Sequence, residues 1–200
     1  MNARRVLVIA MVAVVAIPGC ATLQQIAALH TVRFDFAGVS DVRIAGIPIG
    51  EKTSFRSLSV AHAARLAAAI ATNEVPLELI AHVDATNPAE NAVSARMVAL
   101  DWTLFLDDRQ TLAGGLASPV SIAPGATSDV PLAVRIDLVQ LGNGGARDLF
   151  DLGLAIAGQG TLQKDLRLDL APTIETPLGP MRYAVPVTVR RSTAVTRASE

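Results

Sequence analysis

Residues 77–86 read LELIAHVDAT, and most alternate side chains in this stretch are apolar. Leu77, Leu79 and Val83 fall on one face of an extended chain, whereas Glu78 falls on the other. A repeat of two residues is the period of a β-strand, whose successive side chains point to opposite faces. One apolar and one polar face are typical of an antiparallel sheet that covers a core on one side only. The stretch therefore predicts a half-buried antiparallel strand.

The same alternation recurs along most of the chain, and turn signals separate its segments. The further strand candidates are residues 32–36, 42–49, 98–106, 111–122, 130–138, 162–170 and 183–190. We expect the Gly114-Gly115 pair to bend or bulge the strand over 111–122. Pro131 and Pro186 cannot donate to a strand ladder, which predicts that their strands are edges or carry bulges. About seven to nine short strands between turns predict a mainly β fold, an antiparallel sandwich or barrel.

Residues 57–71 break the strand period and are rich in Ala and Leu. Apolar residues recur there at helical spacing: Val60, Ala64, Ala67 and Ile70. The spacing predicts one amphipathic helix over 57–71, packed over an open end of the sheets. Ser57 or Ser59 is the candidate N-cap, because a serine hydroxyl accepts a hydrogen bond from the first turn. A second short helix is predicted over 147–154.

The N-terminus has the three parts of a secretory signal. Arg4 and Arg5 supply a positive start, residues 6–17 run apolar without a charge, and Pro18-Gly19-Cys20 follows. The apolar run is shorter than the roughly 20 residues that cross a bilayer as a helix. We therefore predict a signal peptide over residues 1–19.

Residues 16–20, AIPGC, resemble the lipobox of bacterial lipoproteins, in which the cysteine receives a diacylglyceride before cleavage. Cys20 is the only cysteine of the chain, so no intramolecular disulfide forms and the thiol is free to carry the lipid. The alternatives are an ordinary signal peptide or an N-terminal anchor with an incidental cysteine. Ala21 resembles the sorting pattern for the outer membrane, which implies an outer-membrane lipoprotein facing the periplasm, with the inner membrane still open.

Two or three acyl chains attach a protein stably, whereas one binds only marginally. The membrane is therefore the predicted partner through the lipid on Cys20. Residues 20–31 are expected to be a tether, and residues 191–200 a flexible tail.

Composition excludes several classes of partner. Without residues 1–19 the chain keeps 15 Lys and Arg against 18 Asp and Glu, a formal charge of about −3. Nucleic-acid binding needs a basic stripe, and none is visible. The remaining length predicts one domain. Because aromatic residues make up only 4% of the chain, the core is expected to consist of Val, Leu, Ile and Ala.

The sequence lacks the motifs of the common catalytic sites. The sequence has no Gly-x-Ser-x-Gly elbow and no phosphate-binding loop. His82 and Asp84 share a strand face and are a possible pair of metal ligands, but a zinc site needs three or four. We expect a solvated strand face there, no catalytic residues, no metal and no cofactor.

The stretch LIAHVDATNP at residues 79–88 resembles the late embryogenesis abundant type 2 family, also called the water-stress and hypersensitive-response domain. Residues 99–106 and 118–138 resemble the strands that follow, whereas Ala89 stands where the family often carries a second Asn. The resemblance implies a seven-stranded sandwich of fibronectin type III or immunoglobulin-like shape with a helix, over residues 32–190. It also implies a role in stress and desiccation tolerance, with no catalytic residues. Both the family resemblance and the local chemistry of the pair predict that Asn87-Pro88 is a structural turn that ends a strand.

Two functions follow from these observations. The first is a membrane-anchored, non-enzymatic binding or protective module with a protein or lipid partner. The second is an accessory subunit of an envelope hydrolase or of a lipid or solute transport complex. An enzyme would show a cleft with converging polar groups.

Overall fold

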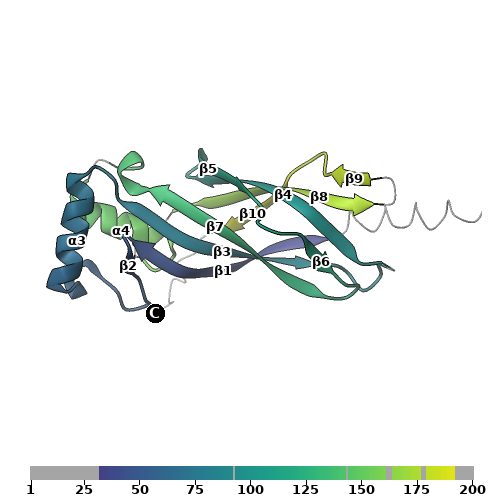
Figure 1. Cartoon of the computed structure of the whole chain (residues 1–200), viewed down its shortest axis with the longest axis horizontal. Helices are drawn as coiled ribbons and strands as arrows, with labels where there is room; N and C mark the ends of the chain where they lie inside the picture. The colour runs from purple at the N-terminus through teal and green to yellow at the C-terminus, as the bar shows by residue number, and fades with distance from the viewer. Residues whose placement is uncertain (1–31, 92, 143, 161–163, 177–178, 192–200) are drawn as a thin grey trace, which may run out of the picture.

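A computed structural model of the chain describes residues 32–191 except 92, 143, 161–163 and 177–178 (Figure 1). The predicted signal peptide, Cys20, the tether and residues 192–200 lie outside these described residues. The described chain forms two antiparallel sheets that face each other as a sandwich, which confirms the predicted mainly β fold.

The first sheet has the order β2-β1-β3-β7. Its strands are β1 (Arg33–Ile44), β2 (Ile47–Pro48), β3 (Pro76–Thr86) and β7 (Thr127–Asp137). The second sheet has the order β10-β8-β4-β5, with β6 paired to β4 and β9 paired to β8. Its strands are β4 (Ala95–Leu106), β5 (Arg109–Gly115), β6 (Val120–Ile122), β8 (Leu166–Thr176), β9 (Gly179–Arg182) and β10 (Val187–Arg191).

The alternation in β3 produces the core directly. Leu77, Leu79, Ala81, Val83 and Ala85 are buried, and the residues between them are half-buried on the outer face. Burying a Val or Leu side chain contributes about 1.5–3 kcal/mol. A shift of one residue in the pairing of β3 with β7 would turn all five outward, so the pattern also fixes the register.

Two α-helices lie together at one end of the sandwich, at the left of Figure 1. The predicted amphipathic helix is α3 (Val60–Ala71), preceded by the short 3-10 helix η1 (Phe55–Ser57). Ser59 is the N-cap, and its Oγ accepts a hydrogen bond from His62 N at 3.2 Å. The face expected to be buried is wrong: Val60 is 89% exposed, Ala64 and Ala67 are also exposed, and Ile70 is half-buried. Leu66 is the buried residue instead, and six positions in a helix place Val60 about a third of a turn away from it.

The second helix, α4 (Ala146–Ile156), is confirmed and is buried more deeply than α3. It follows the 3-10 helix η2 (Leu138–Gln140). A Cβ added at Gly153 would lie 2.6 Å from Ile44 Cδ1 and 3.0 Å from Leu138 Cδ1. The glycine therefore lets α4 approach β1 more closely than any other residue would.

The two sheets meet along two seams. β1 contacts β10 along one seam, and β7 contacts β5 and β6 along the other. Pro131 lies in β7, an edge strand, as predicted from its missing N–H group. Neither α3 nor α4 is long and apolar enough to cross a membrane, and no other described helix is.

Candidate functional site: an apolar cavity between the sheets

A cavity of about 40 Å³ lies inside the sandwich beside the seam between β1 and β10. Its walls are mainly apolar side chains from both sheets and from α4, among them Phe36, Ala81, Leu132 and Leu168. The volume is enough for a water molecule, but a buried water needs two to four polar partners. An apolar ligand group satisfies such walls better than water does.

Arg191 is the charged side chain at this cavity that faces inward. It pairs with Leu166 of β8, and it continues the inward series of Val187 and Val189 along β10. Its guanidinium carbon lies 5.4 Å from the centre of the Phe36 ring on β1, across the seam. The sequence placed Arg191 at the start of the tail, whereas the structure makes it the last residue of an interior-facing strand.

Arg191 has no counter-ion among the residues that the structure describes. Nη2 lies 3.5 Å from the carbonyl oxygen of Gly158, which is long for a hydrogen bond, and the buried Nη1 has no acceptor in the described part of the chain. Among the described residues, no carboxylate lies within ion-pair distance of Arg191. Removing a charge from water is costly unless an anion or hydrogen bonds replace the water. The site is therefore electrostatically incomplete.

Gly158 creates the space that the guanidinium occupies. Its φ of +74° lies in the left-handed region that glycine adopts without strain, at the turn after α4. A Cβ at this position would lie 1.6 Å from Arg191 Nη2. Any other residue at 158 would displace the arginine.

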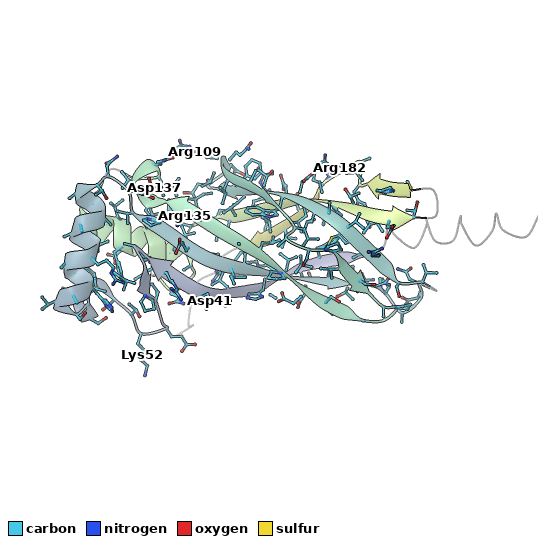
Figure 2. The ribbon with its side chains drawn as sticks, viewed as in Figure 1. Asp41, Lys52, Arg109, Arg135, Asp137 and Arg182 are labelled. Carbon is cyan, nitrogen blue, oxygen red and sulfur yellow. The ribbon has the colours of Figure 1, made fainter. Side chains whose placement is uncertain are left out.

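Several arginines on the outside of the sandwich have carboxylate partners, unlike Arg191. Arg135 and Arg182, labelled in Figure 2, contact Glu78 and Asp101 respectively. Arg167 also borders the cavity, but its guanidinium binds Asp169 at 2.8 Å and lies over the Phe105 ring. Arg167 Nε, like Arg191 Nη1, is buried without a hydrogen-bond partner in the described part of the protein, but Asp169 neutralises the charge of Arg167. Arg191 is thus the arginine at the cavity that lacks a carboxylate partner among the described residues.

A second polar group lies on the outer face of the first sheet. Ser40 Oγ lies 2.8 Å from His82 Nε2, and His82 Nδ1 lies 2.9 Å from Asp129 Oδ2. Three strands contribute one residue each, in the order nucleophile, base and acid of a serine hydrolase. Sequence reasoning considered His82 with Asp84 and missed Ser40 and Asp129, because only the register of β1 and β7 against β3 brings them together.

Solvent reaches this Ser40-His82-Asp129 chain. The side chains of His82 and Asp129 are 28% and 49% exposed. Stabilising an oxyanion takes preorganised donors in a site that excludes water, and charges interact weakly at an open surface. These hydrogen-bonded side chains are well placed to join three strands. Within the described parts of the protein, no three His, Cys, Asp or Glu side chains gather as a metal site.

Asn87 follows the last residue of β3 and is completely buried. Its Nδ2 donates to the carbonyl oxygens of Val93 and Ile122 at 3.0 and 2.9 Å, and its Oδ1 accepts from Asn91 Nδ2 at 2.6 Å. Asn87 thus joins the end of β3 to the loop before β4 and to β6. Sequence reasoning missed Asn91, although its partner Asn87 is only four residues away, because a loop sequence does not show which side chain turns inward.

Comparisons with known proteins give resemblances of low score. No family model matches the chain, and no curated protein matches it. A crystal structure of a protein from Archaeoglobus fulgidus is 18% identical, with a TM-score of 0.36, over 60% of this chain and 87% of that one. The solution structure of AT1g01470 from Arabidopsis thaliana is 17% identical, with a TM-score of 0.38, over 57% and 68%.

The solution structure of At2g46140.1, described as a candidate late embryogenesis abundant protein, is also 17% identical. Its TM-score is 0.40, over 86% of this chain and 75% of that one. These scores assign the chain neither a family nor an activity.

Proposed function

We propose that the protein is a lipid-anchored, non-enzymatic module of the bacterial cell envelope that holds an apolar ligand group between its two sheets. The observation that carries this proposal is the cavity beside the seam, whose walls are mainly apolar and come from both sheets and α4. The lipobox-like sequence before Cys20 supports a tether, which would keep the domain at a membrane surface. A module held there meets lipids at high local concentration.

The binding part of the proposal is tested with an uncharged photoreactive alkyl probe. The full lipidated protein in phosphatidylcholine vesicles is irradiated with the probe, and mass spectrometry maps the adducts. We expect adducts on cavity residues such as Leu132, and we expect Ala81→Leu to remove them by filling the space. Ala99→Leu adds the same side chain on the exposed face of β4 and is the matched control. Adducts that avoid the cavity, or that survive Ala81→Leu in folded protein, would contradict ligand binding there.

The tether is tested by replacing Cys20 with Ala and fractionating the cells. Loss of the protein from the membrane fraction is the expected result, because no other acylation site replaces the only cysteine. Membrane attachment that persists in a correctly cleaved Cys20→Ala protein would rule out the lipid anchor.

The non-enzymatic part is tested at Ser40. Fluorophosphonate probes label serines that a neighbouring base has activated. We expect the full chain to be labelled no more than its Ser40→Ala variant, because the hydroxyl lies on a solvated sheet face. Labelling of Ser40 that disappears in His82→Gln would show an activated nucleophile and refute this part.

Protection during drying is the physiological role implied by the sequence resemblance around Asn87-Pro88. The direct test dries a desiccation-sensitive enzyme with and without the protein and measures the activity recovered after rehydration. Protection greater than that from an inert protein of equal size is expected. Equal protection by the inert protein would leave ligand binding as the proposed role and remove the stress role.

A further inference from the structure

We infer that the ligand is a fatty acid, whose carboxylate binds Arg191 while part of its alkyl chain enters the cavity. This inference rests on the proposed binding function and adds the chemical class of the ligand. It combines two neighbouring features, an interior lined by aliphatic side chains and one inward-facing guanidinium.

The headgroup follows from the geometry around Arg191. Among the groups in residues 32–191 that the structure describes, Nη1 is buried without an acceptor, and Nη2 has only the distant carbonyl oxygen of Gly158. A carboxylate accepts two parallel N–H bonds from a guanidinium, which replaces the missing acceptors and neutralises the charge. A neutral alcohol offers one oxygen and no charge, and a quaternary ammonium headgroup would be repelled.

The alkyl chain follows from the cavity walls. Phe36, Leu132 and Leu168 present no polar atom from their side chains, so methylene groups gain burial without leaving a donor or acceptor unpaired. A volume of about 40 Å³ receives part of one chain, which favours a single-chain amphiphile over a two-chain phospholipid.

The rest of the alkyl chain can lie in the seam beside the cavity. β10 forms ladder hydrogen bonds with β8, whereas it meets β1 of the other sheet without a strand ladder. Side chains such as Phe36 and Arg191 therefore close this seam. They can move apart for an alkyl chain without breaking the ladder of either sheet.

The position of Arg191 allows carboxylate binding at the cavity to be distinguished from non-specific attraction of the anion to a positive charge on the surface. Arg190 is the adjacent residue on the same strand, but it is on the outer face and 59% exposed. Removal of either arginine changes the net charge equally. Only Arg191→Gln removes the group that faces the cavity, so the two variants form a matched pair.

The test compares a long-chain fatty acid bearing a diazirine on its chain with the alcohol of the same length and label. The full lipidated protein in phosphatidylcholine vesicles is titrated with each probe, at a pH where the carboxylate is ionised. The concentration that gives half-maximal labelling of cavity residues is measured. We expect the acid to bind about tenfold more tightly than the alcohol, the factor that one charge-assisted pair contributes.

Arg191→Gln should lower the affinity for the fatty acid by about tenfold, because a charge-assisted pair is lost. The affinity for the alcohol should stay unchanged. Arg190→Gln should change neither probe by more than about twofold, since exposed charges contribute little. Arg191→Lys keeps the charge and should retain part of the preference for the acid, which provides a second variant if Arg191→Gln folds poorly.

Equal labelling by acid and alcohol, or an undiminished preference for the acid in both Arg191 variants, would overturn the fatty-acid inference while the binding function stood. Failure of both probes to label the cavity would instead refute the binding function itself. Cavity labelling that appears only after deletion of residues 192–200 would also overturn the inference, because the chain's own end would then be the occupant.

Discussion

At the scale of single residues, Asn87 shows how one buried amide holds three segments together. Replacement by Ala leaves the carbonyl groups of Val93 and Ile122 and the amide of Asn91 without this partner. We expect Asn87→Ala to lower the free energy of unfolding by about 2–3 kcal/mol. Asn87→Asp should cost more, because a carboxylate cannot donate and would be buried charged.

Urea denaturation followed by the fluorescence of Trp102, the only tryptophan, measures both variants. Trp102 is 3% exposed, so its emission changes on unfolding. Gln110→Ala on the exposed face of β5 is the control and should change stability by less than about 0.5 kcal/mol. A similar small effect at Asn87 would show that its hydrogen bonds contribute little.

Tyr183 gives a prediction for alkaline pH. Burial raises the pKa of its phenol from 10.0 to about 12, because the phenolate loses its hydration. The folded state therefore holds the proton more tightly than the unfolded state. The resulting stabilisation is complete below pH 10.0 and is lost as the pH rises towards about 12.

The measurement is direct because Tyr183 is the only tyrosine. Phenolate absorbance should have its midpoint near pH 12 in the folded protein and near pH 10 in denaturant. Coincident midpoints in the two states would show that the ring is hydrated in the fold.

The sequence predicted some residues of the candidate sites and could not predict others. The alternation in residues 77–86 placed His82 on the wet face, and Pro88 marked the end of the strand. The partners of His82 and Asn87 lie on other strands and loops. Only pairing between strands defines such contacts, and a single sequence does not contain that register.

At the scale of elements, the close pairing of β4 with β5 depends on a missing side chain. Gly114 lies opposite Trp102, and a Cβ there would be 2.3 Å from the indole Cζ2. We expect Gly114→Ala to lower the free energy of unfolding by about 1–3 kcal/mol, because the ring or the strand must shift.

Gly115→Ala is the matched control, since its Cβ would meet the nearest atom, Leu100 O, at an ordinary 3.8 Å. Thermal unfolding by circular dichroism compares the two variants. Equal stability of both would mean that Trp102 finds another rotamer without cost.

Elements with a strong period were predictable, and their contacts with neighbours were not. The single strand expected over 111–122 is divided into β5 and β6 after the glycine pair, where the bend was expected. The strand expected over 162–170 is β8, which begins at Leu166 and continues to Thr176. Val60 met the helical spacing in α3, yet the contacts of Leu66 turned a different face inward.

At the scale of the whole molecule, the sandwich was predictable because alternation makes one apolar face per sheet. The cavity was not, because it depends on how two sheets and α4 fail to fill one region. The inward orientation of Arg191 was not predictable either, since an arginine near the end of a sequence is usually exposed to solvent. Its inward position requires knowing that β10 extends to it and pairs it with Leu166.

Ligand binding between two sheets should also change the motions of the whole domain. A fatty acid at Arg191 contacts β10 and β1 together, so it opposes any opening of this seam but leaves the seam of β7 with β5 and β6 untouched. Hydrogen exchange of the full protein in vesicles, with and without fatty acid, should slow in β10 and β1 first. Slowing by about 100-fold corresponds to ligand at 100 times its Kd.

The same exchange measurement on Arg190→Gln should reproduce the slowing, whereas Arg191→Gln should reduce it at equal ligand concentration. Uniform slowing of hydrogen exchange across both seams would indicate that the fatty acid stabilises the fold without binding specifically in the cavity, or that it alters the vesicles. Slowing confined to the β1–β10 seam and dependent on Arg191 would connect one side chain, one pair of facing strands and the stability of the sandwich in a single equilibrium.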